Sequence, residues 1–185
     1  MNENLYMGVR KAAFATLFLY LDINLGPINI LPKFVGYLLF LRAISYLQEE
    51  NRDFTLLRPL AWLLTGWNLV EWLLKIFGIP LNVPVLGLIV TVVSLYFNFQ
   101  MYTDLAMIAV RYDTPERGRS IRICRNIQTV LMTALNLPIP WKEDTVWQKV
   151  LLAGILLLGG IAAIALIVYL MGLKKALGEQ ELLDP

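Results

Sequence analysis

Histidine is absent from this sequence of 185 residues, and cysteine occurs once, as Cys124. Without histidine the chain lacks the commonest general base of enzymes and the commonest protein ligand of metal ions. A single cysteine excludes an intramolecular disulfide bond. Charged residues are also scarce, at 16% of the sequence, whereas 58% of the residues are hydrophobic. Because so few charges cannot cover the surface of a water-soluble domain, we expect a membrane protein.

Motifs of the common enzyme classes are also missing. The chain contains no glycine-rich phosphate loop, no G-x-S-x-G nucleophile elbow and no H-E-x-x-H motif. Its adjacent acidic residues, Glu49 and Glu50, lie in a mixed-charge segment typical of a solvated surface. The arginine-rich stretch has a single aromatic residue, Tyr112, and therefore no aromatic platform between its charges, which argues against nucleic-acid binding. We therefore expect a protein that is not an enzyme, uses no cofactor or metal ion and binds no nucleic acid.

The hydrophobic residues form segments that approach the length of a membrane span, for which about 20 helical residues are needed. Six such segments can be traced, over residues 12–25, 34–47, 60–77, 85–110, 121–140 and 150–173. Pro59 is expected in the first turn of the third helix, where its missing N–H has little effect. The sequence predicts an all-α fold with one integral membrane domain over residues 1–185, formed by a bundle of five to six transmembrane helices.

Two parts of this bundle allow alternative interpretations. Segments 12–25 and 34–47 are short, and Gly26-Pro27 between them breaks a helix, so the pair either crosses the membrane twice or forms a re-entrant hairpin. Segment 121–140 is polar on one face and apolar on the other. It either crosses with its polar face inward or lies in the cytoplasmic interface. We favour six crossings.

Arginine is concentrated in the stretch RYDTPERGRSIRICR, which we expect to be a cytoplasmic loop at about residues 111–125. With the amino terminus inside and six crossings, twelve lysine and arginine residues lie inside and four lie outside (Lys33, Lys75, Lys142 and Lys149). The same tally results if segment 121–140 lies in the interface, so charge determines the side of the amino terminus only. Lys174-Lys175 after the last segment favours a cytoplasmic carboxyl terminus.

The same loop has a second candidate role. Each basic residue near a membrane surface adds about 1 kcal/mol of attraction to anionic lipid. The loop is therefore either a topology signal alone or a site for anionic lipid or a partner protein. Its candidate residues are Arg111, Arg117, Arg119, Arg122 and Arg125.

Ionisable and amide side chains also interrupt the apolar segments near their expected outer ends. Such groups are costly in a bilayer, so each is a candidate functional residue. The expected topology places six of them at one depth as a candidate substrate-binding cluster: Asp22, Asn24, Asn29, Lys33, Glu71 and Lys75. The structural alternative is mutual neutralisation, with Glu71 and Lys75 spaced as a helical ion pair and Asp22 paired with Lys33. At the inner side, Asp104 is expected to pair with Arg42 or Arg58.

The stretch Asn24–Phe40, NLGPINILPKFVGYLLF, resembles small uncharacterised integral membrane proteins of Gram-positive bacteria. In those proteins a polar turn, Ile-Leu-Pro, an aromatic residue and Gly-Tyr lead into the second helix, and here these are Ile30, Leu31, Pro32, Phe34, Gly36 and Tyr37. The family often has an acidic residue in this turn, where this chain has Asn29 and Lys33, so no acidic role is implied there. The resemblance implies a bacterial plasma membrane and no known activity. In size and number of segments the chain is also similar to the substrate-capture subunits of energy-coupling-factor vitamin transporters.

Two functional hypotheses follow. The first is a membrane protein that binds or transports a small solute through the outer polar cluster. The alternative is a structural or interaction subunit of a membrane complex, which docks a partner protein or anionic lipid.

Overall fold

The computed structural model describes residues 3–20, 24–25, 28–29, 32–79, 83–136 and 146–183. Within these ranges the chain forms six helices and one short hairpin, so the all-α prediction is confirmed. The elements are α1 (Glu3–Tyr20), β1 (Asn24–Leu25), β2 (Ile28–Asn29), α2 (Lys33–Leu47), α3 (Asp53–Ile76), α4 (Pro84–Tyr112), α5 (Pro115–Asn136) and α6 (Val146–Leu183). The hairpin was not predicted. It pairs Asn24 with Asn29 and Leu25 with Ile28 in antiparallel register.

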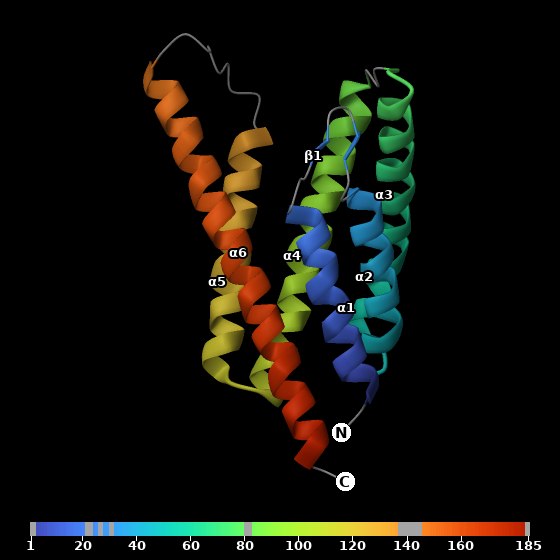
Figure 1. Ribbon diagram of the computed structural model, residues 1–185, viewed down its shortest axis with the longest axis vertical. Coiled ribbons are helices and arrows are strands. Elements are labelled where there is room, and N and C mark those ends of the chain that lie inside the picture. The colour runs from blue at the N-terminus through green and yellow to red at the C-terminus, as the bar shows by residue number, and fades with distance from the viewer. Residues whose placement is uncertain are drawn as a thin grey trace.

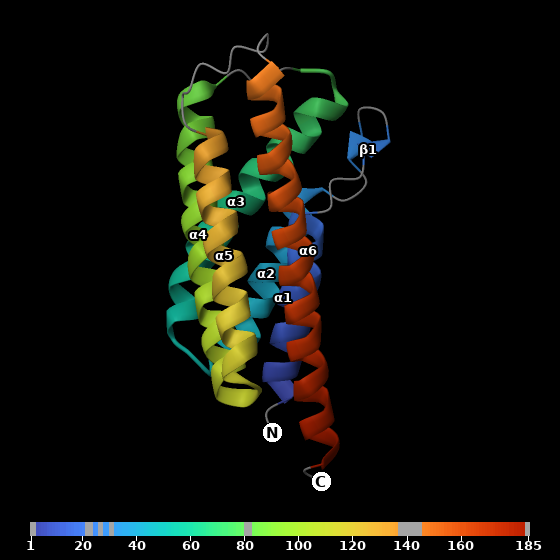
Figure 2. The ribbon, with the colours of Figure 1, turned by 90° about the vertical axis from the view of Figure 1, so that its left-hand side faces the viewer.

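The helices run alternately up and down, and each packs against the next in sequence (Figure 1). Because α6 also packs against α1, the six helices form a closed ring. Figure 2 shows α6 crossing in front of α1 and α2 as it descends. The start of α1, the end of α6 and the α2–α3 and α4–α5 turns lie together at one end of the bundle, here named the terminal end. The hairpin lies towards the opposite end, here named the hairpin end.

Helices α1 and α2 pack closely because α1 presents small residues to its neighbour. A Cβ atom added to Gly8 would lie 2.6 Å from the Leu47 side chain, so glycine permits this approach of the two helices. The next turns of α1 continue the small face with three fully buried alanines, Ala12, Ala13 and Ala15.

An aromatic cluster joins α2 to α4 in the core. Phe40 contacts Phe97 edge to face at 5.4 Å between ring centroids, and Tyr37 contacts Phe97 at 5.7 Å. Phe40 also lies 6.4 Å from the ring of Tyr102. Edge-to-face pairs of this kind stabilise a core by roughly 0.5–1.5 kcal/mol beyond the area they bury. The Tyr102 hydroxyl donates to Thr16 Oγ1 at 3.2 Å, which extends the cluster to α1.

The predicted loop over residues 111–125 is wrong, because only Asp113 and Thr114 are non-helical between α4 and α5. Pro115 occupies the first position of α5, and Thr114 Oγ1 accepts a hydrogen bond from the Arg117 backbone N–H at 3.3 Å. A threonine cap, a proline at the first position and an acidic first turn are typical of a helix start. Helix α5 then lies lengthwise beside α4 and α6, and not across an end of the bundle (Figures 1 and 2).

Helix α3 begins at Asp53, upstream of the predicted start, so the expected position of Pro59 in its first turn is wrong. Asn51 Oδ1 accepts a hydrogen bond from the Asp53 backbone N–H at 3.0 Å and supports this earlier start. Pro59 therefore lies inside the helix, where it cannot donate to the carbonyl of Thr55.

Two of the described helices are long and apolar enough to cross a membrane. They are α4 and the Val146–Glu179 part of α6. Only 17% of the apolar window in each is buried inside the bundle. These two helices support the membrane class that the composition predicts.

Candidate functional site

A cavity of about 570 Å³ lies in the half of the bundle nearer the hairpin end. Helices α1 to α5 all contribute to its wall, and along α4 it extends from Pro84 to Asn98. At a rise of 1.5 Å per residue this stretch of helix is about 21 Å long, so the cavity reaches deep into the bundle. Its volume falls within the range of roughly 300–1,000 Å³ that is typical of small-molecule sites.

The charged residues of the cavity lie at the part of the cavity that is closest to the hairpin end, here named its outer end. Lys33 is the first residue of α2, and Glu71 lies one turn before the last turn of α3. The expected helical ion pair is present, with Lys75 Nζ 2.9 Å from Glu71 Oε1. Both signs of charge are therefore available near the ends of the helices, where water can solvate them.

The inner part of the cavity is uncharged and hydrogen bonded. The hydroxyls of Tyr37 and Ser94 lie 2.8 Å apart, and Asn98 Nδ2 lies 3.5 Å from Ser94 Oγ. Asn98 Oδ1 is buried and has no hydrogen-bond partner within the described part of the chain. These groups can exchange hydrogen bonds with a polar solute, whereas they offer no compensating charge to a buried ion.

The side walls are rich in hydrogen-bond acceptors. Asn68 donates to the Leu64 carbonyl at 2.7 Å, and Asn136 donates to the Met132 carbonyl at 2.8 Å. The Thr91 hydroxyl likewise donates to the backbone of its own helix. Each of these bonds uses a donor of the side chain and leaves its oxygen as an acceptor. Tyr20 and Trp67 add aromatic surface to the same cavity.

The structure brings together two of the six residues of the predicted substrate cluster, Lys33 and Glu71, in one cavity wall. Lys75 lies beside them through its ion pair with Glu71. Asn24 and Asn29 face each other in the hairpin register, and their side chains lie outside the described residues. Asp22 also lies outside them, so its pairing with Lys33 stays a prediction.

The remaining polar residues of the cavity were missed by the sequence reasoning. On α4 the lining residues Gly87, Thr91, Ser94 and Asn98 recur at intervals of three or four residues. This spacing places them on one face of a helix. A search of the fourth segment for small and polar residues that recur with the period of a helix would have found this face. Asn136 lies on the polar face predicted for segment 121–140. Asn68 carries no comparable signal, because only the fold places it opposite this face of α4.

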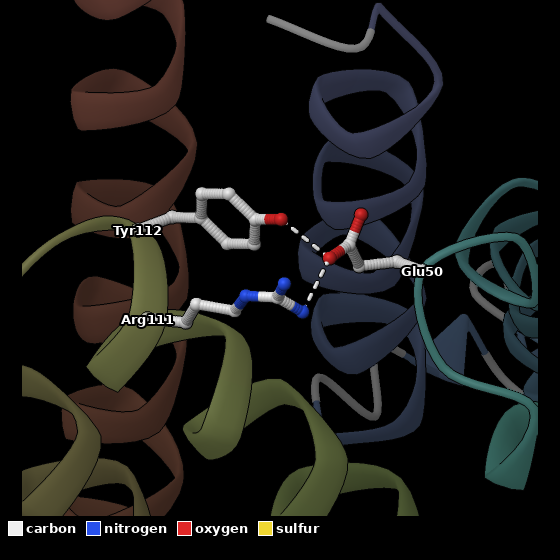
Figure 3. Close-up of polar contacts among 3 residues, drawn as sticks. All are labelled: Glu50, Arg111 and Tyr112. Atoms are coloured by element: carbon white, nitrogen blue, oxygen red, sulfur yellow. Dashed lines mark hydrogen bonds and ion pairs between the residues drawn. The ribbon is translucent and has the colours of Figure 1, made fainter.

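At the terminal end, the candidate arginine Arg111 is held by Glu50 (Figure 3). Arg111 donates to Glu50 Oε1 at 2.8 Å, and the Tyr112 hydroxyl donates to the same oxygen. Glu50 lies in the turn after α2, whereas both donors lie in the last turn of α4. The contact therefore joins two turns of the terminal end.

Two more of the candidate arginines are half-buried and engaged by neighbouring residues. Arg117 forms an ion pair with Asp113 one turn earlier. Arg125 lies over the Phe99 ring at 4.1 Å and donates to the Thr103 hydroxyl. The last two, Arg119 and Arg122, are exposed on α5.

The expected pairing of Asp104 with Arg42 or Arg58 is wrong. Asp104 is fully buried and accepts a hydrogen bond from Gln100 Nε2 at 3.0 Å through Oδ1. Its Oδ2 has no hydrogen-bond partner in the described ranges. Arg42 and Arg58 are both exposed, because their positions on α2 and α3 face away from the core.

No family model, curated protein or solved structure matches this chain. The resemblance of Asn24–Phe40 to small membrane proteins of Gram-positive bacteria and the expected lack of enzymatic activity therefore stay predictions. Across the ranges that the structure describes, no group of three or more His, Cys, Asp or Glu residues gathers in a way that could hold a metal ion.

Proposed function

We propose that the protein crosses a bacterial plasma membrane six times and binds or transports a small polar solute in the cavity near the hairpin end. The observation that supports this most strongly is the cavity itself. Five helices line it, uncharged hydrogen-bonding groups form its inner part, and Lys33 and Glu71 lie near its outer end. A solute with several polar groups would exchange its hydration for these contacts.

The exposed apolar surface supports the membrane placement. A soluble monomer rarely exposes large contiguous apolar patches, whereas a membrane protein presents them to lipid. On α3 the exposed side chains include Trp62, Leu63 and Val70. Helix α3 is not one of the two described helices that are long and apolar enough to cross a membrane. Exposed leucine, isoleucine and valine side chains also follow α6 along most of its length, at Val150, Leu151, Leu156, Leu157, Leu158, Ile161, Ile164 and Val168.

The proposed orientation places the terminal end in the cytoplasm. This end carries the start of α5 with its arginines and the last part of α6 with Lys174 and Lys175. Basic residues close to membrane spans are retained on the cytoplasmic side. Since α1 begins and α6 ends at the same end of the bundle, both termini are cytoplasmic in this proposal, and the cavity lies towards the outer face.

The test fills the cavity without disturbing the helix that lines it. A Cβ atom on Gly87 meets nothing within 4 Å, so a Gly87→Leu side chain fits the fold and occupies cavity space. Gly66→Leu is the matched control, because Gly66 is also helical, also has open space around its Cβ position and does not line the cavity. Thermal stability of the purified proteins is measured against amino acids, vitamins, nucleobases, sugars and ions.

A ligand that binds the folded state raises its thermal stability by mass action. We expect one class of solute to stabilise the wild type and the Gly66→Leu variant, and to lose its effect in the Gly87→Leu variant. Stabilisation that survives in Gly87→Leu would place the solute elsewhere and reject the cavity as its site. Stabilisation by no solute at all would reject solute binding and favour the alternative of an interaction subunit.

A further inference from the structure

The five arginines at residues 111–125 differ in whether the fold already engages them. Arg111, Arg117 and Arg125 form ion pairs or hydrogen bonds with residues of the bundle. Arg119 and Arg122 are exposed, and neither forms a hydrogen bond or ion pair with another described residue. These two guanidinium groups are therefore available to a ligand. Glu116, one turn before Arg119, is the acidic residue of the first turn of α5 and offsets part of their charge.

Arg119 and Arg122 lie on the same face of α5, since residues three apart on a helix are neighbours. From Arg119 an apolar stripe continues towards the hairpin end through Ile123, Ile127 and Val130, which are 49%, 40% and 66% exposed. Their spacing of four and three residues keeps them in one stripe. Arg122 flanks this stripe, on the same side as the exposed Asn126. One free cation, Arg119, thus heads an uncovered apolar stripe, and the second, Arg122, lies beside it.

The length of this face matches one leaflet of a bilayer. Arg122 and Val130 are eight residues apart, which is about 12 Å along a helix. One leaflet contributes about 15 Å of the hydrocarbon core. With the guanidinium groups at the depth of the headgroups, the stripe therefore spans most of the acyl region.

We propose that Arg119 and Arg122 bind the phosphate of an anionic phospholipid, one acyl chain of which lies along Ile123, Ile127 and Val130. Guanidinium groups form paired hydrogen bonds to phosphate oxygens. Two guanidinium groups side by side match the charge of one phosphodiester and of one further anionic group next to it. This inference rests on the membrane placement proposed above. It is independent of the solute cavity, which no residue of this face lines.

The test measures lipid retention by the full-length protein in neutral detergent, using native mass spectrometry. The probes are phosphatidylglycerol, which is anionic, and phosphatidylcholine, which has no net charge. The R119Q/R122Q variant removes both free cations. The R52Q/R58Q variant is the control, because Arg52 and Arg58 are exposed near the start of α3 and the change in net charge is the same.

We expect the wild type to retain phosphatidylglycerol in preference to phosphatidylcholine. The apparent affinity for phosphatidylglycerol should fall on the order of 30-fold in R119Q/R122Q, and less than about threefold in R52Q/R58Q. Circular dichroism confirms that both variants keep their helices. Soluble sn-glycerol 1-phosphate at the same concentration should compete poorly, because it lacks the acyl chain.

Three outcomes would overturn the proposal: equal retention of both lipids by the wild type, equal loss in the two double variants, or competition by glycerol phosphate as effective as that of the lipid. Failure of the membrane placement itself gives a different result. In that case the protein would stay monodisperse in buffer without detergent. If the protein needs detergent but shows no lipid preference, only the lipid site is rejected.

Discussion

Glu50 accepts a hydrogen bond from Arg111 at 2.8 Å, across 61 residues of sequence (Figure 3). The Glu50 side chain is 18% exposed and the Arg111 side chain is 68% exposed. The pair therefore lies at the surface on one side and against the bundle on the other. It connects the turn after α2 to the last turn of α4, so it contributes to the closure of the terminal end.

The first prediction concerns this pair. A double-mutant cycle with Glu50→Gln and Arg111→Gln should give a coupling free energy of about 0.5–1 kcal/mol, because solvent at the exposed guanidinium screens the interaction. Thermal unfolding in detergent measures the cycle at low and at high salt. The coupling should shrink at high salt. A coupling of zero at low salt would show that the pair does not stabilise the fold.

The second prediction concerns the buried hydrogen bond from Tyr102 to Thr16. Tyr102→Phe removes this bond and should lower the free energy of unfolding by about 0.5–1.5 kcal/mol. Thr16 keeps its own hydrogen bond to the Ala12 carbonyl at 2.8 Å, so it retains a partner. Tyr96→Phe is the control on the same helix, because Tyr96 is 58% exposed. Equal effects of the two substitutions on thermal stability would contradict the structural role of the bond.

A third prediction tests the close contact of α4 with α5. A Cβ atom on Gly118 would lie 2.4 Å from Val110 Cγ2 and 2.8 Å from the Ala106 carbonyl oxygen, so Gly118→Ala forces the helices apart. We expect a loss of about 1–3 kcal/mol, typical of overpacking. Gly66→Ala has open space and should be neutral or stabilising, since alanine favours a helix over glycine by about 1 kcal/mol. Thermal unfolding of the two variants compares them directly, and a stable Gly118→Ala protein would argue against this packing.

The fourth prediction tests the proposed orientation. Cys124 is the single cysteine and is buried, so it is first replaced by alanine. Single cysteines are then introduced at Asn51, in the α2–α3 turn, and at Ile79, after α3. A membrane-impermeant maleimide should label Ile79→Cys in intact cells, and Asn51→Cys only after permeabilisation. The opposite pattern would invert the topology, and labelling of both positions in intact cells would reject a membrane crossing by α3, which lies between them.

Local features of the sequence were sufficient to predict the helical class and several of its parts. Apolar segments separated by polar or Gly- and Pro-containing stretches predicted five to six helices, because such stretches interrupt the hydrophobic pattern of a helix. Pro59 does not follow this pattern, since it lies inside α3 and does not end it. The ion pair of Glu71 with Lys75 also depends on spacing within one helix and was predicted. The helix start at Thr114-Pro115-Glu116 was equally local, and it was missed only because the density of arginines suggested a loop.

The apolar, helical class and the contacts within single helices can thus be read from the sequence, since they depend on neighbours a few residues apart. Which polar residues meet is set by the packing of the helices. Asn68 and Asn98 line one cavity because α3 and α4 pack side by side, and Glu50 holds Arg111 because two turns lie at one end of the bundle. The same packing leaves Arg119 and Arg122 free while their three neighbours are engaged. Such pairings depend on the positions of helices distant in sequence, and no spacing along the chain encodes them.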